Sequence, residues 1–354
     1  MFDKIYNYLK DFYVPAERPA LEFQIEQFSK SDELRGKKIL DATPVFRNTL
    51  NKYLPLLAAG ADLTVGYGVG VPFDREIIKL LNDWGVKTVP NGMFFDDYDF
   101  IFDCAGVNCD GIAEYGVSEL TRTGFYHYEK LDHKVFLADS SKIKTIETAL
   151  GTGDGFLRAM RKLGHGDLAD KKIVIFGCGK VGYGVAMYCA ENGAEVYAVD
   201  DWSKRKKYQN FYCIDRFDRK TTDDLLDAAY CVVSATGIKN ALAENVDLQK
   251  LAGSAALIAN IGVEDEFGDL IAPERVLNNK KPLNFILDEP THLKFIDPTM
   301  ALHNAGALVL YHDKSNEKFL IPSDELNDFY LKIVRRYGII NEELKMLEKY
   351  NMQD

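Results

Sequence analysis

The residues with the clearest chemical meaning form a glycine-rich turn at residues 177–182 (GCGKVG). Gly177 permits a tight turn, Gly179 lets backbone amides approach a pyrophosphate, and Gly182 lets a helix pack closely on a strand. The helix that begins at this turn presents unpaired N–H groups to an anion. The spacing predicts a dinucleotide site, whose phosphate-binding residues are Gly177, Gly179, Lys180, Val181 and Gly182.

The elements that must position this turn are two strands and a helix. Residues 173–176 (IVIF) predict a buried parallel strand, residues 181–192 an amphipathic helix that Gly193 ends, and residues 196–199 a second strand. Asp200 follows this second strand, where a carboxylate binds the ribose hydroxyls of a dinucleotide. The pattern thus predicts a Rossmann unit.

Asp200 also bears on the choice between NAD and NADP. A carboxylate repels the 2′-phosphate of NADP, so Asp200 favours NAD as the cofactor. The basic run at residues 204–207 (KRKK) supports the alternative, because cationic side chains just beyond this strand can hold a 2′-phosphate. The same run could instead be the solvated start of a helix in an acidic chain.

The composition of the 354-residue chain is that of a globular protein long enough for two domains. Its net charge of −11 argues against a nucleic-acid groove or an anionic membrane surface. No apolar stretch reaches the ~18 residues of a spanning helix, and the acid-containing N-terminus lacks the apolar region of a signal peptide. We therefore expect a cytoplasmic protein with a small-molecule substrate, and neither nucleic acid nor membrane as a partner.

The six cysteines and six histidines form neither a metal-binding nor a disulfide pattern. No two cysteines have the CxxC spacing, and no histidines have the HxH or HxxxH spacing of common metal ligands. Most of the cysteines lie in apolar segments. We expect reduced cysteines and no protein-bound metal.

The first part of the chain alternates short apolar runs with helical patterns, which is typical of a parallel sheet. Strands are predicted at residues 38–40, 63–65, 100–102 and 135–137, with helices over residues 45–59 and 74–84 that Gly60 and Gly85 close.

The second part begins with a glycine-rich run at residues 151–155 (GTGDG), which predicts a hinge before a helix over residues 156–163. Polar and glycine residues at the carboxyl ends of parallel strands bind ligands in this architecture. They predict further cofactor contacts from Thr236, Asn260, Ile261 and Gly262. Strands are predicted at residues 230–234, 256–261 and 283–287, and a later helix over residues 299–310.

The expected fold is α/β, with two doubly wound parallel-sheet domains and a cleft between them. We expect a substrate-type α/β domain over residues 1–152 and the Rossmann NAD-binding domain over residues 153–298. Residues 299–354 are expected to form helices that return to the first domain. A cleft of this kind can close on a substrate.

These motifs resemble the S-adenosylhomocysteine hydrolase family over nearly the whole chain. The family's NAD loop, GYGDVGKG, resembles residues 177–184 (GCGKVGYG), and its TTTG and NIG strand ends resemble residues 234–237 and 260–262. Its SEETTTG segment, which contacts the nicotinamide end of NAD, resembles residues 118–124 (SELTRTG). Its HPSF hinge resembles residues 292–295 (HLKF). The resemblance implies cofactor contacts from Thr121 and Thr123 and a homo-oligomer.

In that family, bound NAD oxidises a ribose 3′-hydroxyl, which acidifies the neighbouring C4′ proton and allows a thiol to leave. Retained NADH later reduces the product. The lysine and aspartate that assist the oxidation align with Ile143 and Glu147, and Lys142 and Lys144 flank the lysine position. The resemblance therefore implies cofactor chemistry with local changes around the reacting hydroxyl.

The substrate residues of the family are replaced more widely. A family aspartate aligns with Cys104 and the ribose-binding glutamate with Leu120. Two histidines align with Asp41 and Val263, whereas the threonine two positions after the first histidine is kept as Thr43. These departures imply an altered substrate site.

Several candidate residues also have simpler explanations. Glu147 could take a hydroxyl proton or form a surface pair with Lys144. Asp41 could bind a ligand or cap a turn, and Cys104 could react or fill a small core space. The catalytic candidates are Glu147, Lys144, Lys142, Asp41 and Cys104.

The substrate-binding candidates are Thr43, Arg122 and His292. Arg122 could hold a substrate carboxylate or phosphate, or pair with a surface acid. His292 could contact the cofactor or cap a turn.

Three classes of function remain open from the sequence. The first is an NAD-dependent enzyme of the adenosylhomocysteine-hydrolase type with an altered substrate. The second is an NAD-linked dehydrogenase of a small hydroxy or amino acid held by Arg122. The third is a non-catalytic NAD-binding regulatory relative. Retained NAD that is regenerated marks the first class, stoichiometric NADH release the second, and bound NAD without turnover the third.

Overall fold

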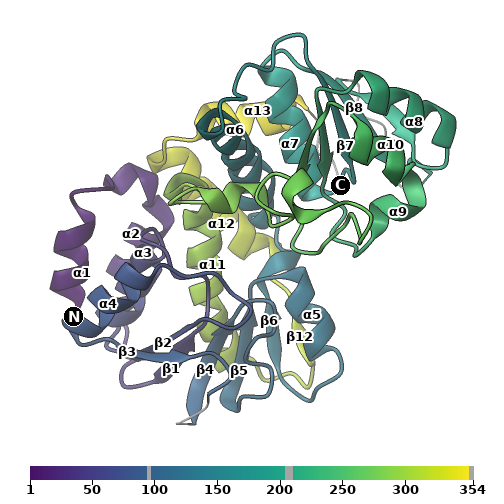
Figure 1. Ribbon diagram of the computed structural model, residues 1–354. Helices are drawn as coiled ribbons and strands as arrows, with labels where there is room; N and C mark the ends of the chain where they lie inside the picture. Colours follow the sequence, from purple (N-terminus) through teal and green to yellow (C-terminus); the bar gives the residue numbers. More distant parts are fainter. Residues whose placement is uncertain (94–96, 204–209, 351–354) are drawn as a thin grey trace. The chain divides into compact units, whose positions relative to one another are not determined.

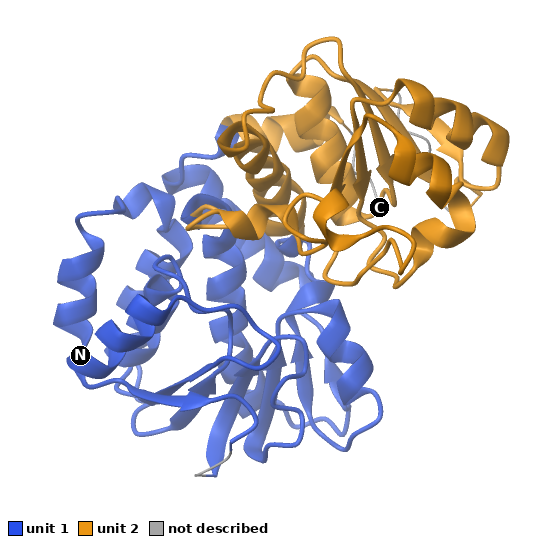
Figure 2. Ribbon diagram, in the orientation of Figure 1, with its two compact units in different colours: residues 1–144, 293–341 blue, residues 145–292, 342–354 orange. Residues whose placement is uncertain are grey.

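The computed structural model describes residues 1–93, 97–203 and 210–350 (Figure 1). The chain forms two compact units (Figure 2). Unit 1 contains residues 1–144 and 293–341, and unit 2 contains residues 145–292 and the chain from Glu342 onward. The sequence placed the boundaries after residues 152 and 298. In the structure the chain passes between units after Lys144, after His292 and after Asn341.

Unit 1 is an α/β unit whose strands all run parallel. Its strands are β1 (Lys38–Asp41), β2 (Asp62–Tyr67), β3 (Lys87–Pro90), β4 (Tyr98–Asp103), β5 (Ala113–Glu119), β6 (Val135–Leu137) and β12 (Phe319–Leu320). Its helices are α1 (Phe2–Leu9), α2 (Pro19–Phe28), α3 (Leu50–Ala58), α4 (Arg75–Trp84), α5 (Arg122–Tyr128), α11 (Leu293–His312) and α12 (Asp324–Tyr337).

The strand order of unit 1 is β12-β6-β5-β4-β1-β2-β3. Starting from β1, the chain first builds the sheet outward through β2 and β3, then returns and builds the other side from β4. The direction of building reverses between β1 and β4. In doubly wound sheets, the crevice at such a switch point, outside the carboxyl ends of the strands, is where ligands bind.

Unit 2 has the same arrangement with fewer strands. Its strands are β7 (Lys172–Phe176), β8 (Glu195–Asp200), β9 (Tyr212–Asp215), β10 (Cys231–Ser234) and β11 (Leu257–Asn260), in the parallel order β11-β10-β7-β8-β9. Its helices are α6 (Thr152–Lys162), α7 (Lys180–Glu191), α8 (Arg219–Ala228), α9 (Ala241–Asn245) and α10 (Leu248–Gly253), and α13 (Asn341–Lys349) begins where the chain re-enters the unit. The switch point lies between β7 and β10.

The fold class predicted from the sequence is therefore confirmed, as are most of the predicted strands. Three strands in unit 1, β3, β5 and β12, were missed, together with β9 in unit 2. The short run of β5 (AEYGVSE) carries polar residues and a glycine, so its apolar pattern is weak. The strand predicted at residues 283–287 is wrong, because residues Leu283–Ile286 form a 3₁₀-helix after Pro282.

Two helices begin well away from the residues predicted. The helix expected from residue 45 begins at Leu50, because Val45 instead forms a parallel bridge with Phe73. The helix expected from residue 299 begins at Leu293 and contains Pro298.

The glycine-rich run at residues 151–155 is helical, so the predicted hinge is wrong. A π-helical stretch, Ile146–Gly151, leads directly into α6. A Cβ on Gly153 would lie 2.5 Å from the carbonyl oxygen of Gly184 in α7, and a Cβ on Gly184 would collide with the carbonyl oxygen of Ala149. These glycines allow close helix packing, whereas the sequence had suggested flexibility.

The end of the described chain belongs to unit 2, although the sequence assigned it to the first domain. The Lys349 ammonium lies 2.5 Å from the Glu191 carboxylate, and the Tyr350 hydroxyl donates to the same oxygen at 2.7 Å. The Tyr350 ring stacks on Phe211 with 5.6 Å between centroids. These contacts fasten the end of α13 to α7.

All six cysteines are free thiols among the residues described. The same part of the chain holds no helix with the length and apolarity needed to cross a bilayer.

Alanine at Gly153 is expected to destabilise the protein, although alanine normally stabilises a helix interior by about 1 kcal/mol over glycine. The clash is with backbone that cannot rotate away, and overpacking of this kind costs roughly 1–3 kcal/mol. Denaturant unfolding of G153A should therefore have a lower midpoint than that of the wild type.

The matched control is Gly253→Ala. Apart from its chain neighbours and the backbone of its own helix, no described atom lies within 4 Å of a Cβ added at Gly253, and its φ is not in the left-handed region. G253A should be as stable as the wild type or slightly more so. If G153A unfolded at the wild-type midpoint, the close packing of α6 on α7 would be refuted.

Candidate functional site

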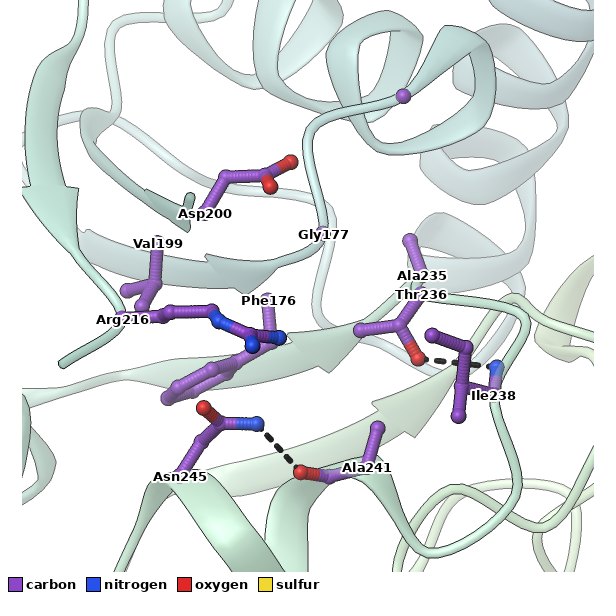
Figure 3. A pocket seen from close by; sticks show the side chains of 11 residues that line it. Phe176, Gly177, Val199, Asp200, Arg216, Ala235, Thr236, Ile238, Ala241 and Asn245 are labelled. Carbon is purple, nitrogen blue, oxygen red and sulfur yellow. Dashed lines mark hydrogen bonds between the residues drawn. The ribbon is translucent and has the colours of Figure 1, made fainter. Parts of the chain in front are cut away.

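A pocket of about 150 Å³ opens at the switch point of unit 2 (Figure 3). It lies at the carboxyl ends of β7, β8 and β10, where doubly wound sheets bind nucleotides. Its lining combines apolar groups with a few polar ones. The lining residues are Phe176, Gly177, Gly179, Val199, Asp200, Arg216, Ala235, Thr236, Ile238, Ala241 and Asn245.

The glycine turn has the conformation that its spacing predicts. Gly177 has a φ of +86°, and a Cβ there would lie 2.8 Å from the backbone of Ala235. A Cβ on Gly182 would collide with the carbonyl oxygen of Gly177. Gly179 is the N-cap of α7 and lines the pocket, so the amides of the first turn of α7 are at the pocket wall. This geometry fits a pyrophosphate.

Asp200 ends β8 and lines the same pocket. Its carboxylate accepts the N–H of Cys178 at 2.6 Å and the N–H of Asp201 at 2.7 Å. The acid therefore ties the glycine turn to the second strand. A carboxylate at this strand end is the group that binds ribose hydroxyls in dinucleotide-binding folds. The basic run at 204–207 lies outside the described residues.

The turn after β10 is held by a glutamate that the sequence analysis missed. Glu266 is fully buried and accepts the amides of Thr236 at 2.9 Å and Gly237 at 2.7 Å. It also accepts the hydroxyls of Thr236, at 2.7 Å, and of Ser234. Thr236 thus lines the pocket with its hydroxyl already engaged. The only sequence signal was an acid shortly after the NIG strand end.

The NIG strand end, residues 260–262, packs beside the turn after β10 and has structural hydrogen bonds of its own. The side-chain amide of Asn260 donates to the carbonyls of Glu264 at 2.8 Å and Lys280 at 2.6 Å, and its oxygen accepts the N–H of Gly262 at 3.0 Å. The Ile261 amide donates to the Ser234 carbonyl at 2.9 Å. Asn260, Ile261 and Gly262 are not among the residues that line the described pocket.

In unit 1, acids end three neighbouring strands: Asp41 on β1, Asp103 on β4 and Glu119 on β5, all fully buried. One Asp41 oxygen accepts the hydroxyl of Thr43 at 2.5 Å and the Thr43 amide at 3.1 Å. The other forms an ion pair with Lys52 of α3. Asp41 and Thr43 thus lie together, with a lysine the sequence analysis did not select. Its signal was a lone cation in the apolar run LNKYLPLLA.

His303 of α11 lies in the same buried region and was also missed. Its Nε2 lies 2.6 Å from the carbonyl oxygen of Ser118, and its ring centroid lies 5.3 Å from that of Phe102. The Lys52 ammonium sits 4.4 Å from the Phe102 centroid. A carbonyl only accepts, so Nε2 must carry the hydrogen and Nδ1 a lone pair in the neutral ring.

Burial, and then the charges of Lys52 and Lys144, hold the pKa of His303 well below its usual value. The imidazole is therefore neutral near pH 7. Nδ1 is buried and finds no hydrogen-bond partner within the described ranges. The ring thus offers a hydrogen-bond acceptor beside two cations. Burial likewise lowers the pKa of Lys52, against the opposing effect of Asp41.

The structure separates the other catalytic candidates. Lys144 is buried and close enough to affect His303, whereas Lys142 is exposed and pairs with Asp324 at 3.0 Å. Glu147 is half-buried in the π-helical stretch of unit 2. Lys144 and Asp41 therefore belong to the His303 region, and Lys142 does not.

Asp103 and Glu119 form a second buried network beside Cys104. Asp103 accepts the Tyr128 hydroxyl at 2.6 Å, and Glu119 accepts the amides of Ala105 at 3.1 Å and Gly106 at 3.2 Å. Burial raises the pKa of Asp103 to about 6. Burial and the charge of Asp103 raise the pKa of Glu119 to about 8.

The residues of the SELTRTG segment have structural partners in this region. The Thr121 hydroxyl donates to Glu119 at 2.7 Å and accepts the amide of Gly124 at 3.1 Å, which caps α5. Thr123 is half-buried in the first turn of α5. Arg122 is exposed, and its guanidinium lies over the rings of Phe125 at 4.6 Å and Tyr126 at 5.3 Å. Among the described residues, Arg122 forms no ion pair with an acid.

His292, the last residue before the chain returns to unit 1, is anchored in unit 2. Its Nδ1 lies 3.3 Å from an Asp154 oxygen that also accepts Arg158 Nε at 2.7 Å. Burial raises the pKa of Asp154, but the hydrogen bond from His292 and the charge of Arg158 outweigh it and hold the pKa below its usual value. His292 therefore pairs with an ionised acid.

No group of three or more His, Cys, Asp and Glu side chains in the described part of the chain could hold a metal ion.

Residues 134–262 match the family model of the D-isomer specific 2-hydroxyacid dehydrogenase NAD-binding domain. A dipicolinate synthase chain from Bacillus halodurans has 14% identity and a TM-score of 0.50, with 79% of this chain and 100% of that chain covered. The Sinorhizobium meliloti transhydrogenase has 12% identity and a TM-score of 0.44, with 77% of this chain and 95% of that chain covered. The NAD⁺-bound D-lactate dehydrogenase of Lactobacillus jensenii has 15% identity and a TM-score of 0.37, with 80% of this chain and 99% of that chain covered.

The family match spans most of unit 2, including the glycine turn, Asp200 and the turn after β10. Together with the pocket, it confirms NAD as the cofactor and identifies unit 2 as an NAD-binding domain of the dehydrogenase type. The chain thus carries the domain of an NAD-dependent oxidoreductase.

Replacing Gly179 with valine is expected to abolish most NAD binding, because a branched side chain would stand at the N-cap of α7 where the pyrophosphate must lie. Isothermal titration calorimetry should show at least a tenfold weaker dissociation constant, about 1.4 kcal/mol. Gly179→Ala should have a smaller effect. NAD affinity equal to wild type in a folded G179V protein would contradict the assignment of the phosphate site.

Proposed function

We propose that this protein is an NAD-dependent oxidoreductase that takes hydride from an alcohol carbon in the manner of adenosylhomocysteine hydrolases, on a substrate other than adenosylhomocysteine. Bound NAD supplies the hydride acceptor. The observation that carries the proposal is the neutral, buried His303 beside the Asp41–Lys52 pair, whose Nδ1 has no hydrogen-bond partner among the described residues.

The two units suggest a division of labour. Both sheets have the same switch-point topology, but β7 is followed by a glycine turn and β1 by Ala42, Thr43 and Pro44. The latter turn lacks the glycines that let backbone approach a pyrophosphate. Its strand end carries titratable groups instead. This supports unit 2 as the cofactor unit and unit 1 as the source of the groups that handle substrate.

Oxidation of an alcohol separates a hydride on carbon from a proton on oxygen, and the proton needs a base. His303 Nδ1 is a base whose tautomer the Ser118 carbonyl sets. The nearby charges of Lys52 and Lys144 favour negative charge that develops on the substrate oxygen. In this scheme Asp41 is a positioning residue, because it holds the Lys52 ammonium in place.

The altered substrate specificity rests on three buried side chains. Ile143, Leu120 and Cys104 are only 2%, 7% and 7% exposed, and they stand where the resembling family has a lysine, a glutamate and an aspartate. Ile143 and Leu120 cannot hydrogen-bond ribose hydroxyls. A buried polar group left unpaired costs about 1–3 kcal/mol, so adenosylhomocysteine should bind poorly.

A second candidate is an NAD-linked dehydrogenase of a small hydroxy acid, which the 2-hydroxyacid dehydrogenase match favours. It requires a cation for the substrate carboxylate. Arg122 is exposed and stacked on aromatic rings, so Lys52 and Lys144 are the buried alternatives. The two candidates differ in the fate of the cofactor, which is retained in the first and released as NADH in the second.

A substrate panel tests the proposal. Homocysteine release from adenosylhomocysteine, measured with a coupled thiol assay, should stay far below the ordinary enzyme turnover of about 1 s⁻¹. Other nucleosides and small hydroxy acids should be assayed for change at the alcohol carbon by mass spectrometry, with NADH absorbance followed in parallel. Turnover near 1 s⁻¹ on adenosylhomocysteine would overturn the altered specificity, and stoichiometric NADH release would favour the hydroxy-acid dehydrogenase.

His303→Gln tests the base directly on a substrate found by the panel. Glutamine keeps a donor for the Ser118 carbonyl but is not a base near pH 7, so turnover should fall by about 10²-fold or more. NAD affinity should not change, because the cofactor pocket is lined by unit 2. His312→Gln is the control, since His312 is exposed on the same helix and contacts Glu33. Full activity in H303Q would place the base elsewhere.

A further inference from the structure

We propose that Arg216 is a specificity residue of the cofactor pocket, and that its guanidinium stacks on the adenine face of bound NAD. The inference rests on the assignment of this pocket to NAD and names a residue outside the glycine turn and the Asp200 position.

Arg216 stands next to the acid that faces the ribose. It directly follows β9, and its backbone N–H donates to the carbonyl oxygen of Asp200 at 3.0 Å. Asp200 and Asp215 are paired in register between β8 and β9. A side chain from this position reaches the part of the pocket beside the adenosine ribose, and Figure 3 shows the Arg216 side chain extending along the pocket wall.

The Arg216 side chain packs on a neighbouring ring but keeps hydrogen-bonding capacity. The guanidinium carbon lies 4.6 Å from the centroid of the Phe217 ring. Its Nε is buried and has no hydrogen-bond partner in the part of the chain that the structure describes. A planar guanidinium pairs favourably with a flat ring, and arginine contributes such cation–π contacts to bases. A purine also carries ring nitrogens that accept hydrogen bonds.

The rest of the lining favours a base over a phosphate. Apolar side chains of Phe176, Val199, Ile238 and Ala241 make up much of the wall, which suits a flat, weakly polar ring. The carboxylate of Asp200 stands in the same pocket and repels a 2′-phosphate. Arg216 is the one cation among the lining residues described, whereas phosphates are commonly held by several donors.

Calorimetric titration of Arg216 variants tests the stacking role with NAD, ADP-ribose, nicotinamide mononucleotide and NADP. Arg216→Ala should weaken NAD and ADP-ribose by about tenfold, since stacking on a base is worth at least this much. Nicotinamide mononucleotide, which has no adenine, should bind as to wild type. Arg216→Lys keeps the charge without the planar group, so it should resemble R216A.

The control is Arg161→Ala, which removes the same charge from α6 at a residue outside the pocket lining. Its NAD affinity should equal that of wild type, and unfolding midpoints without ligand should confirm that each variant is folded. Unchanged NAD and ADP-ribose affinity in R216A, with weaker NADP, would show a 2′-phosphate contact and overturn the proposal. Wild-type affinity in R216K would overturn it too, because charge alone would then suffice.

A wild-type protein that binds neither NAD nor ADP-ribose would refute the cofactor assignment of the pocket itself. That failure is distinct from the failure of the Arg216 role, in which wild type binds NAD and the R216A variant binds it equally well.

Discussion

The geometry of unit 2 depends on close backbone contact between the turn after β7 and the turn after β10. A Cβ on Gly177 would lie 2.8 Å from the backbone of Ala235, and a Cβ on Gly182 would collide with the carbonyl oxygen of Gly177 at the first turn of α7. Without these contacts α7 could not start at the strand end with its first-turn amides at the pocket. The same constraint recurs behind α7, where Gly184 and Gly153 bring two helices together. These glycines position the cofactor site mainly because they have no side chain and so allow close packing, and less because their backbone is flexible.

In both units a buried glutamate binds the backbone amides of the turn after the fourth strand along the chain, which is β4 in unit 1 and β10 in unit 2. In unit 1, Glu119 accepts the amides of Ala105 and Gly106, and in unit 2, Glu266 accepts those of Thr236 and Gly237. Each acid comes from the neighbouring strand or the loop after it. A buried carboxylate is expensive to desolvate, and several charge-assisted hydrogen bonds offset that cost. The raised pKa of Glu119 shows that desolvation and the nearby Asp103 still oppose its ionisation.

The two switch points have the same strand topology but carry different chemical groups. The pocket of unit 2 presents backbone amides, the carboxylate of Asp200 and apolar walls, which suit a dinucleotide. The corresponding edge of unit 1 is filled by an ion pair and a neutral imidazole in a low-dielectric region, where electrostatic effects are large. The first arrangement binds the cofactor, and the second is the proposed site of proton transfer.

The sequence by itself determined the local elements of this protein. The GCGKVG turn, its flanking strands and Asp200 are encoded within a few tens of residues, because backbone conformation and strand burial follow from local spacing. Where one residue type has two uses, local pattern misled, as at the glycines of residues 151–155 and in the apolar run at 283–287. Only tertiary structure decided which lone polar residues meet. Asp41, Lys52 and His303 come together from β1, α3 and α11. Glu266 reaches the turn after β10, and Arg216 reaches the cofactor pocket, each from a later loop. A single buried cation or imidazole has no periodicity of its own, so its partner is set by packing between distant segments.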